Sequence, residues 1–380
     1  MLIRQLRFDS TTVSAEALAP LREIAPQLVL LFASITHFEA GVFDTGLRAA
    51  LPGATWLGCS TAGEIFADGV SDYSAVITAI HFEHPDFRVA SATLTDMAGS
   101  QAVGAELGRA LQAPDLKGVL VFGQGVNING SALIAGIASE TGPAVTISGG
   151  LAGDAGRFQR TYVLSDKGNP EQAVVALGIY GEHLHLSHGS RGGWQAFGPL
   201  RQITRFEGNV LHELDGRPAL ELYRRYLGEH AEQLPASGLL FPFSMMGADG
   251  EDLDVIRTIL GVDNATGSLI LAGGLIENGY LRLMHASTDR LVDGAEAAAG
   301  QCHRENPPDS KGLALLVSCV GRKLVMGGRT EEEIEAVGRV LGPGYVMAGF
   351  YSNGEIGPGK NNGSSQLHNQ TMTITCLYES

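Results

Sequence analysis

The two ends of this chain carry the same fifteen-residue pattern, and this repeat limits the folds that the chain can adopt. Aligned without gaps, residues 51–65 (LPGATWLGCSTAGEI) match residues 342–356 (GPGYVMAGFYSNGEI) at two glycines and at the closing Gly-Glu-Ile. An apolar run precedes each copy, at residues 28–33 (LVLLFA) and 313–317 (LALLV), and helix-like apolar spacing follows the second run. Each copy is therefore predicted to be a unit of strand, helix, strand and turn.

Two further segments resemble this unit more weakly. One runs from a strand predicted at residues 119–122 to residues 144–154 (AVTISGGLAGD), and the other is centred on residues 269–275 (LILAGGL). Both contain Gly-Gly-Leu, and the Ala-Gly-Asp that ends at residue 154 repeats the Ala-Gly-Glu that ends at residue 64. We therefore expect four related units, two in each half of the chain.

Segments with β-like composition follow the turns, so strands are expected to outnumber helices. They are residues 75–82, 87–94, 173–180, 183–188 and 371–377. The predicted fold class is α/β (mixed α+β), with mixed sheets covered by helices. At 380 residues the chain exceeds what one core usually supports, and glycine, proline and asparagine punctuate residues 195–215. The predicted domains are residues 1–205 and residues 206–380.

Charge and cysteine usage exclude several classes of protein. With 26 Lys and Arg against 41 Asp and Glu, the formal charge is −15, which disfavours nucleic acid and anionic membrane surfaces as partners. No segment reaches the roughly 18 apolar residues of a spanning helix, so we expect a cytoplasmic protein. The four cysteines are far apart in sequence and lack CxxC spacing, which indicates buried thiols rather than a zinc site or a disulfide framework.

The repeated turns each end in a glycine followed by an acid. These acids are Glu64, Asp154 and Glu355. Backbone amides and a short acidic side chain at the end of a strand can converge on a ligand. A turn that needs glycine for its backbone explains the glycines equally well.

Two histidines are predicted to lie on apolar strand faces. If residues 368–376 form one strand, His368 shares a face with Met372, Ile374 and Cys376, and His188 shares one with Leu184 and Leu186. Either histidine could ligate a metal or haem iron, or be a hydrogen-bonded structural residue. Without a CxxCH motif, only non-covalent haem b is open.

Arg257 is a cation inside the apolar run of residues 254–260, where it could clamp a carboxylate or pair with a nearby acid. Enzyme motifs are poor by comparison. The Gly-Cys-Ser-Thr-Ala at residues 58–62 misses the final glycine of a nucleophile elbow, and neither a dinucleotide fingerprint nor a phosphate-binding loop is complete. Cys59 and Ser60 leave a hydrolase as the remote alternative.

Five blocks together resemble the FIST family in the expected order. They are LGCSTAGEI at residues 57–65, SGGLAGD at 148–154, LHELDGRPALELY at 211–223, YSNGEI at 351–356 and HNQT at 368–371. The resemblance implies FIST N-terminal and C-terminal domains over nearly the whole chain and an intracellular sensory module for small ligands such as amino acids. One branch of the family is similar to stand-alone haem proteins that sense nitric oxide and regulate a partner histidine kinase.

From this resemblance we expect a sensor, not an enzyme, that binds haem b, senses nitric oxide and signals to a separate protein such as a histidine kinase. The alternative is a FIST sensor that binds an amino acid or a similar small molecule without haem. Self-association into a homo-oligomer is left open. The expected ligand-binding residues are Glu64, Asp154, Arg257, Tyr351, Asn353, Glu355, His368 and Asn369, and the candidate haem ligands are His368 and His188.

Overall fold

A computed structural model describes residues 1–43, 45–165, 171–307, 309–359 and 363–380, and in this part of the chain one unit occurs three times. Each unit has an outer strand, a parallel pair of central strands joined through a helix, and a last strand that inserts between the outer strand and the pair. Adjacent parallel strands need such a crossover connection, which explains the helix-like spacing before each repeated turn.

The first unit occupies residues 2–81. Its elements are β1 (Leu2–Phe8), a 3-10 turn (Glu16–Leu18), α1 (Ala19–Arg22), β2 (Leu28–Ser34), α2 (Ile35–Glu39), α3 (Thr45–Arg48), β3 (Thr55–Thr61), β4 (Glu64–Phe66), β5 (Gly69–Ser71) and β6 (Ala75–His81). The second unit comprises β7 (Phe87–Thr93), a 3-10 turn (Met97–Gly99), α4 (Ser100–Leu111), β8 (Leu116–Gly123), α5 (Gly130–Thr141), β9 (Thr146–Leu151), β10 (Val163–Leu164) and β11 (Ala173–Tyr180).

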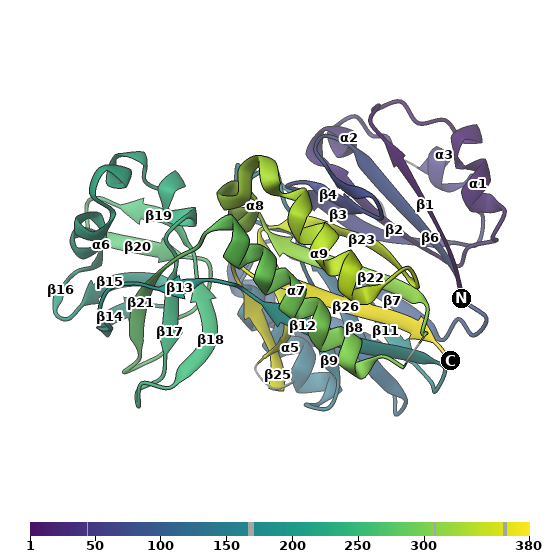
Figure 1. The fold of residues 1–380 in the computed structure, drawn as a ribbon. Coiled ribbons are helices and arrows are strands. Elements are labelled where there is room, and N and C mark those ends of the chain that lie inside the picture. Colours follow the sequence, from purple (N-terminus) through teal and green to yellow (C-terminus); the bar gives the residue numbers. More distant parts are fainter. Residues whose placement is uncertain (44, 166–170, 308, 360–362) are drawn as a thin grey trace.

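The third unit is interrupted after its first strand. Its elements are β12 (Leu184–Arg191), α7 (Thr288–Glu305), β22 (Gly312–Cys319), α8 (Val320–Met326), a 3-10 turn (Gly327–Arg329), α9 (Glu331–Leu341), β23 (Tyr345–Ser352), β24 (Gly354–Gly359), β25 (Gly363–His368) and β26 (Met372–Glu379). Helices α7 and α9 lie across one face of its sheet (Figure 1).

The interruption is an inserted domain of antiparallel strands, drawn in teal at one end of the molecule in Figure 1. It contains β13 (Gln195–Ala196), β14 (Arg201–Glu207), β15 (Val210–Leu214), β16 (Arg217–Pro218), α6 (Ala219–Leu227), 3-10 turns at Gly228–Gln233 and Ala236–Leu239, β17 (Phe243–Met246), β18 (Asp252–Arg257), β19 (Ile259–Asp263), β20 (Ser268–Leu271) and β21 (Tyr280–His285). Its own apolar core lies between α6 and the sheet.

The three units exchange strands in a cycle. The hairpin β4–β5 of the first unit extends the sheet of the third at β23, and the hairpin β24–β25 of the third extends the sheet of the second at β9. Strand β10 of the second unit then pairs with β3 of the first. Each sheet is therefore completed by its neighbour, so the units cannot separate without breaking strand pairs. We call these three units the core.

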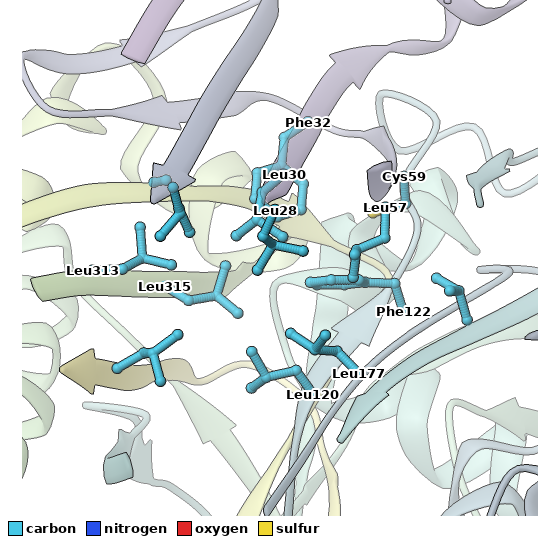
Figure 2. Packing of buried hydrophobic residues seen from close by; sticks show 14 of the residues in the cluster. Leu28, Leu30, Phe32, Leu57, Cys59, Leu120, Phe122, Leu177, Leu313 and Leu315 are labelled. Carbon is cyan, nitrogen blue, oxygen red and sulfur yellow. The ribbon is translucent and has the colours of Figure 1, made fainter. Parts of the chain in front are cut away.

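A shared apolar centre fills the space between the three sheets (Figure 2). The ring of Phe32 lies 4.8 Å from Phe350 and 5.5 Å from Phe122 between centroids, and all three rings are fully buried. Because each ring comes from a different unit, the centre is built only when all three units are in place.

The repeat places a glycine at one equivalent position of each unit, at Gly58, Gly149 and Gly349. A Cβ at any of the three would overlap the backbone carbonyl of the facing residue on the neighbouring parallel strand. Close backbone approach therefore explains why glycine stands at both aligned positions, 58 and 349, of the sequence repeat.

The structure confirms a mixed α/β fold built from repeated strand-helix-strand units. The described residues contain three such units, and not the four that we expected. Residues 269–275 belong to the inserted domain, where β20 has antiparallel partners on both sides, so they are not a fourth unit. Residue 205, the predicted domain boundary, lies inside β14. In the sequence, the inserted domain therefore lies between the two parts of the core, residues 1–191 and 288–380. None of the helices in the described ranges is long and apolar enough to cross a membrane.

Candidate ligand-binding cleft

A cleft of about 430 Å³ lies where the chain leaves the core for the inserted domain and returns from it. The core contributes residues 188–193 of β12 and the connection after it, Gln301, Arg304 and Glu305 of α7, Pro358, Gly359, His368 and Thr371. The connection also supplies Trp194, and the inserted domain supplies Ser244, Asp252, Asp254, Val255, Ile256 and Met284. Ligand sites often form between domains, and this volume is within their usual range.

The walls of the cleft carry charges of both signs. Arg191 of the core faces Asp254 of the inserted domain across 3.5 Å, and both side chains are about half exposed. An exposed pair of this kind contributes little stability, so a bound ligand can compete for either partner. Within the described residues Arg304 forms no ion pair, which leaves a guanidinium free at the wall.

His188 lies in the wall of the cleft on β12 and is 8% exposed. Its Nδ1 atom is 3.3 Å from Thr375 Oγ1, and its backbone N–H donates to Glu305. Burial lowers the pKa of this imidazole to about 4, so the ring is neutral at pH 7.

His368 lines the same cleft from the end of β25 and is 4% exposed. Its Nε2 atom donates to the carbonyl of Pro358 at 3.1 Å, and burial lowers its pKa. The predicted continuous strand is wrong at this point, because β25 ends at His368 and β26 begins at Met372. A turn with a left-handed residue, Gln370, separates them. The fold therefore brings both candidate histidines to one cavity.

Arg257 lies directly behind the cleft and joins the inserted domain to the core. Its guanidinium donates to the carbonyls of Ile256, Gly274 and Leu367, the last of which belongs to β25. We expected an acidic partner, but no carboxylate of the described residues lies within ion-pair distance. Burial without a counter-charge lowers the pKa of Arg257 to about 10.

Several buried oxygen atoms near this junction lack a partner among the described residues. They are Oδ1 of Asn353, Oδ1 of Asn369, Oε1 of Gln370 and Oγ1 of Thr258. Asn353 and Asn369 flank the same end of the β24–β25 hairpin, one or two positions beyond the Glu355–His368 pair. Unsatisfied buried acceptors are rare, and they mark a polar junction that can accept donors from water or a ligand.

The acids of the repeated turns have internal partners instead. Glu64 accepts from Thr61 Oγ1 and from Ser74 N and Oγ, and Glu355 accepts in the same pattern from Ser352 Oγ and from Thr371 N and Oγ1. Asp154 accepts three backbone N–H groups, from residues 158 to 160. All three are fully buried and hold their turns together.

Tyr351 also points into the core. Its hydroxyl donates to Glu333 at 2.6 Å, and Glu333 pairs with Arg322 at 2.6 Å where neither side chain is exposed. Among the expected ligand-binding residues, the structure therefore places His368 in the cleft and Arg257 and Asn369 next to it. Glu64, Asp154, Tyr351 and Glu355 lie in structural networks.

The two turn glutamates predict a specific pH dependence of stability. Desolvation raises the pKa of both Glu64 and Glu355 to about 7, above the 4.5 of an unperturbed glutamate. The folded state then binds more protons than the unfolded state between pH 4.5 and 7. Each group therefore lowers the free energy of unfolding as pH rises through this window, by on the order of 3 kcal/mol.

Glu355→Gln removes this titration. As pH rises from 4.5 to 7, we therefore expect the free energy of unfolding of the variant to increase relative to that of the wild type. Denaturant unfolding of both proteins at several pH values measures the difference. The two proteins are compared with each other because His188, whose pKa is lowered in the folded state, makes the free energy of unfolding rise with pH in both of them. Parallel pH curves for the two proteins would refute the assignment.

The sequence did not indicate the charged rim of the cleft. Arg191, Arg304 and Asp254 lie in three separate segments with no shared motif, and only the insertion brings them together. His188 and His368 were accessible to sequence reasoning because a histidine on an apolar strand face is unusual.

The fold and the cleft define an α/β protein of three interlocked units with an inserted domain and a polar interdomain site. The chain belongs to the FIST family, because the FIST N domain model matches residues 27–217 and the FIST C domain model matches residues 219–358. FIST domains are associated with sensing and signal transduction.

Similar curated proteins carry no assigned function. The uncharacterized protein Rv0628c of Mycobacterium tuberculosis is 28% identical over 251 residues, 62% of each chain. The uncharacterized protein MJ1623 of Methanocaldococcus jannaschii is 24% identical over 207 residues, 50% of this chain and 38% of its own. This chain thus spans about 62% of the first relatives' length. A solved structure of cyanuric acid hydrolase from A. caulinodans covers 99% of this chain and 98% of its own, at 10% identity and a TM-score of 0.35, too low for a functional argument.

Proposed function

We propose that this chain is a sensor that binds a small zwitterionic molecule, such as an α-amino acid, in the interdomain cleft. The observation that carries the proposal is the lining of one cavity of about 430 Å³, which includes the guanidinium of Arg304, without an ion-pair partner among the described residues, and the carboxylates of Asp252 and Asp254. A zwitterion needs a cation for its carboxylate and an anion for its ammonium group within a few ångströms. The cleft lining includes both charges, together with a neutral donor from the side-chain amide of Gln301.

The position of the cleft suits signalling. A ligand that bridges Arg191 or Arg304 of the core and Asp254 of the inserted domain stabilises one relative orientation of the two parts. We propose that a separate protein such as a histidine kinase reads this orientation in the cytoplasm, and that the chain itself is not an enzyme.

Haem b with nitric oxide as the signal is the second candidate, because both candidate histidines border the same cleft. The lining fits a haem poorly. Apolar side chains in it are Trp194, Val255, Ile256, Met284 and Pro358, and the remaining residues are charged, polar or glycine. A macrocycle needs apolar walls on both faces, so the residues present favour the smaller polar ligand.

A thermal-shift screen over the L-amino acids tests the proposal. At a ligand concentration one hundred times Kd, we expect a stabilisation of about 2.7 kcal/mol for at least one amino acid. Arg304→Glu reverses the free cation and should weaken that amino acid at least tenfold. Arg339→Glu, on the exposed face of α9 and outside the cleft, is the matched control and should bind as the wild type.

Absorption spectra of the protein mixed with haem separate the two candidates. A Soret band that shifts with nitric oxide and is lost in His188→Ala or His368→Ala would mean that the ligand is haem and not an amino acid. Failure of every amino acid together with a featureless haem spectrum would overturn both.

A further inference from the structure

A second cleft, of about 520 Å³, adjoins the interdomain cleft. The two clefts share His188, Glu305 and Pro358 in their linings, so they are two parts of one groove. A cleft of a few hundred Å³ already holds a drug-sized ligand. The groove as a whole is therefore larger than a single α-amino acid requires.

Strand β12 runs along both parts of the groove. Residues 184–186 and 188 line the second cleft, and residues 188–191 line the interdomain cleft. Strand β12 is also an edge strand, because β26 is its one partner among the described strands. The free side of an edge strand presents N–H and C=O groups with which a further strand can pair.

The backbone N–H groups of His188 and Ser190 point to this free side. They donate to side chains of α7 and not to β26, at 3.4 Å to Oε2 of Glu305 and at 2.8 Å to Oε1 of Gln301. Two side-chain acceptors thus stand where the carbonyls of an added strand would lie. The bond from His188 is long and Glu305 is exposed, so a carbonyl of a ligand can replace the carboxylate there.

The same side of β12 is open in the second cleft. Backbone groups alternate in direction along an antiparallel pair, and the register of β12 with β26 has no shift, so the N–H and C=O groups of Leu186 point the same way as those of His188. Strand β24 lies beside β12 but belongs to another sheet. Its Pro358 lines both clefts and has no N–H to donate, which helps to keep the two sheets apart.

The two ends of the groove carry groups that suit the two ends of a peptide. Asp252 and Asp254 lie at the end formed by the inserted domain. Lys117 lies at the other end, where it is exposed and has no ion-pair partner in the part of the chain that the structure describes. Glu182 lines that end as well but does not pair with Lys117. An ammonium group and a carboxylate can therefore bind at opposite ends.

The distance between these ends sets the length of the ligand. Leu186 in the second cleft and Ser190 in the interdomain cleft are four residues apart on β12, which is about 13 Å along a strand. An extended peptide advances by the same rise per residue, so about three to five residues span the groove. A single amino acid cannot reach both ends.

We propose that the ligand of this sensor is a short free peptide that lies along the groove as an added strand on β12. This inference rests on the proposed function, because it extends the ligand of the same cleft. The peptide ammonium binds Asp252 and Asp254, and the carboxylate binds Lys117. Arg304, which would hold the carboxylate of a single amino acid, donates to a peptide carbonyl instead. Because backbone groups make the pairing, peptides of different sequence should bind.

Calorimetric titration of the full chain with alanine, dialanine and tetra-alanine tests the proposal. We expect tetra-alanine to bind at least tenfold more tightly than dialanine, because only the longer peptide reaches both ends of the groove. Acetylation of its N-terminus or amidation of its C-terminus should each weaken binding at least tenfold. These capped peptides distinguish a free peptide from an internal segment of a protein, which has neither terminal charge.

Lys117→Glu should weaken tetra-alanine at least tenfold and leave the binding of dialanine unchanged. Lys311→Glu is the matched control, because Lys311 is equally exposed and lies outside both clefts. It should bind both peptides as the wild type does. Equal binding of tetra-alanine by Lys117→Glu and Lys311→Glu would contradict the placing of the carboxylate.

N-methylated tetra-alanine tests the strand pairing itself. Neighbouring N–H groups of an extended peptide point in opposite directions, so only one of its two central N–H groups can face β12. A methyl group on that nitrogen should weaken binding at least tenfold, and a methyl group on the other should weaken it by no more than about threefold. Equal effects at the two positions would overturn the pairing with β12.

The results separate this proposal from the proposed function on which it rests. An amino acid that binds in the interdomain cleft, together with tetra-alanine that binds no more tightly than dialanine, would overturn the peptide and leave the amino-acid sensor in place. Capped peptides that bind as tightly as the free one would likewise overturn it. Failure of every amino acid and every peptide to bind would overturn both.

Discussion

Replacing Glu333 by alanine is expected to lower the free energy of unfolding by about 3–5 kcal/mol, the usual effect of leaving one member of a buried ion pair alone. Glu333 accepts from Arg322 at 2.6 Å, from Ser318 at 3.0 Å and from Tyr351 at 2.6 Å, and all four side chains are fully buried. Its loss leaves the buried guanidinium of Arg322 without a counter-charge. This guanidinium also donates to the carbonyls of Gly192 and Leu291, next to the cleft. Equilibrium unfolding in urea measures the change.

The same helix supplies the control for this substitution. Glu332 pairs with Arg329 at 2.7 Å, but both side chains are about half exposed. Glu332→Ala should therefore change the free energy of unfolding by less than about 1 kcal/mol. Similar losses of unfolding free energy in Glu333→Ala and Glu332→Ala would contradict the claim that burial makes the Arg322–Glu333 pair important for stability.

Gly349→Ala is expected to destabilise the protein by about 3 kcal/mol or more, because the added methyl group would overlap the backbone of Leu316. The facing strand cannot move away, since β22 and β23 pair along their whole length at the centre of their sheet. The backbone of Gly349 itself is not in the left-handed region, so steric overlap alone causes the loss. Thermal and urea unfolding give the size of the effect.

Gly328→Ala is the matched control. A Cβ at Gly328 would meet no atom within 4 Å, and its backbone is equally ordinary. We expect a change of less than about 0.5 kcal/mol. A Gly349→Ala protein as stable as this control would contradict the close strand pairing that defines the repeated unit.

The sequence repeat predicted the unit correctly because its glycines have a physical cause. Gly58 and Gly349 occupy equivalent positions against a neighbouring backbone, and Glu64 and Glu355 accept the same pattern of donors. The fourth unit was wrong because Gly-Gly-Leu at residues 273–275 carries no information on strand direction. The strand in this segment, β20, ends at Leu271 and has antiparallel partners, and the apolar pattern alone could not distinguish antiparallel from parallel pairing.

The candidate site was predictable only in part. Parity placed His188 on a buried face, and His368 reached the cleft although the turn after it breaks the predicted strand. Arg304 and Asp254 depend on the insertion between β12 and α7, whose boundaries follow from strand pairing and not from composition.

Hydrogen–deuterium exchange on the full chain, with and without the amino acid that stabilises it most, tests the central claim most directly. The account predicts protection in peptides that cover residues 188–194, 252–256 and 301–305, with no change around Glu64 or Asp154. Protection confined to the repeated turns, or absent from all three cleft segments, would contradict the assignment of the interdomain cleft as the ligand site.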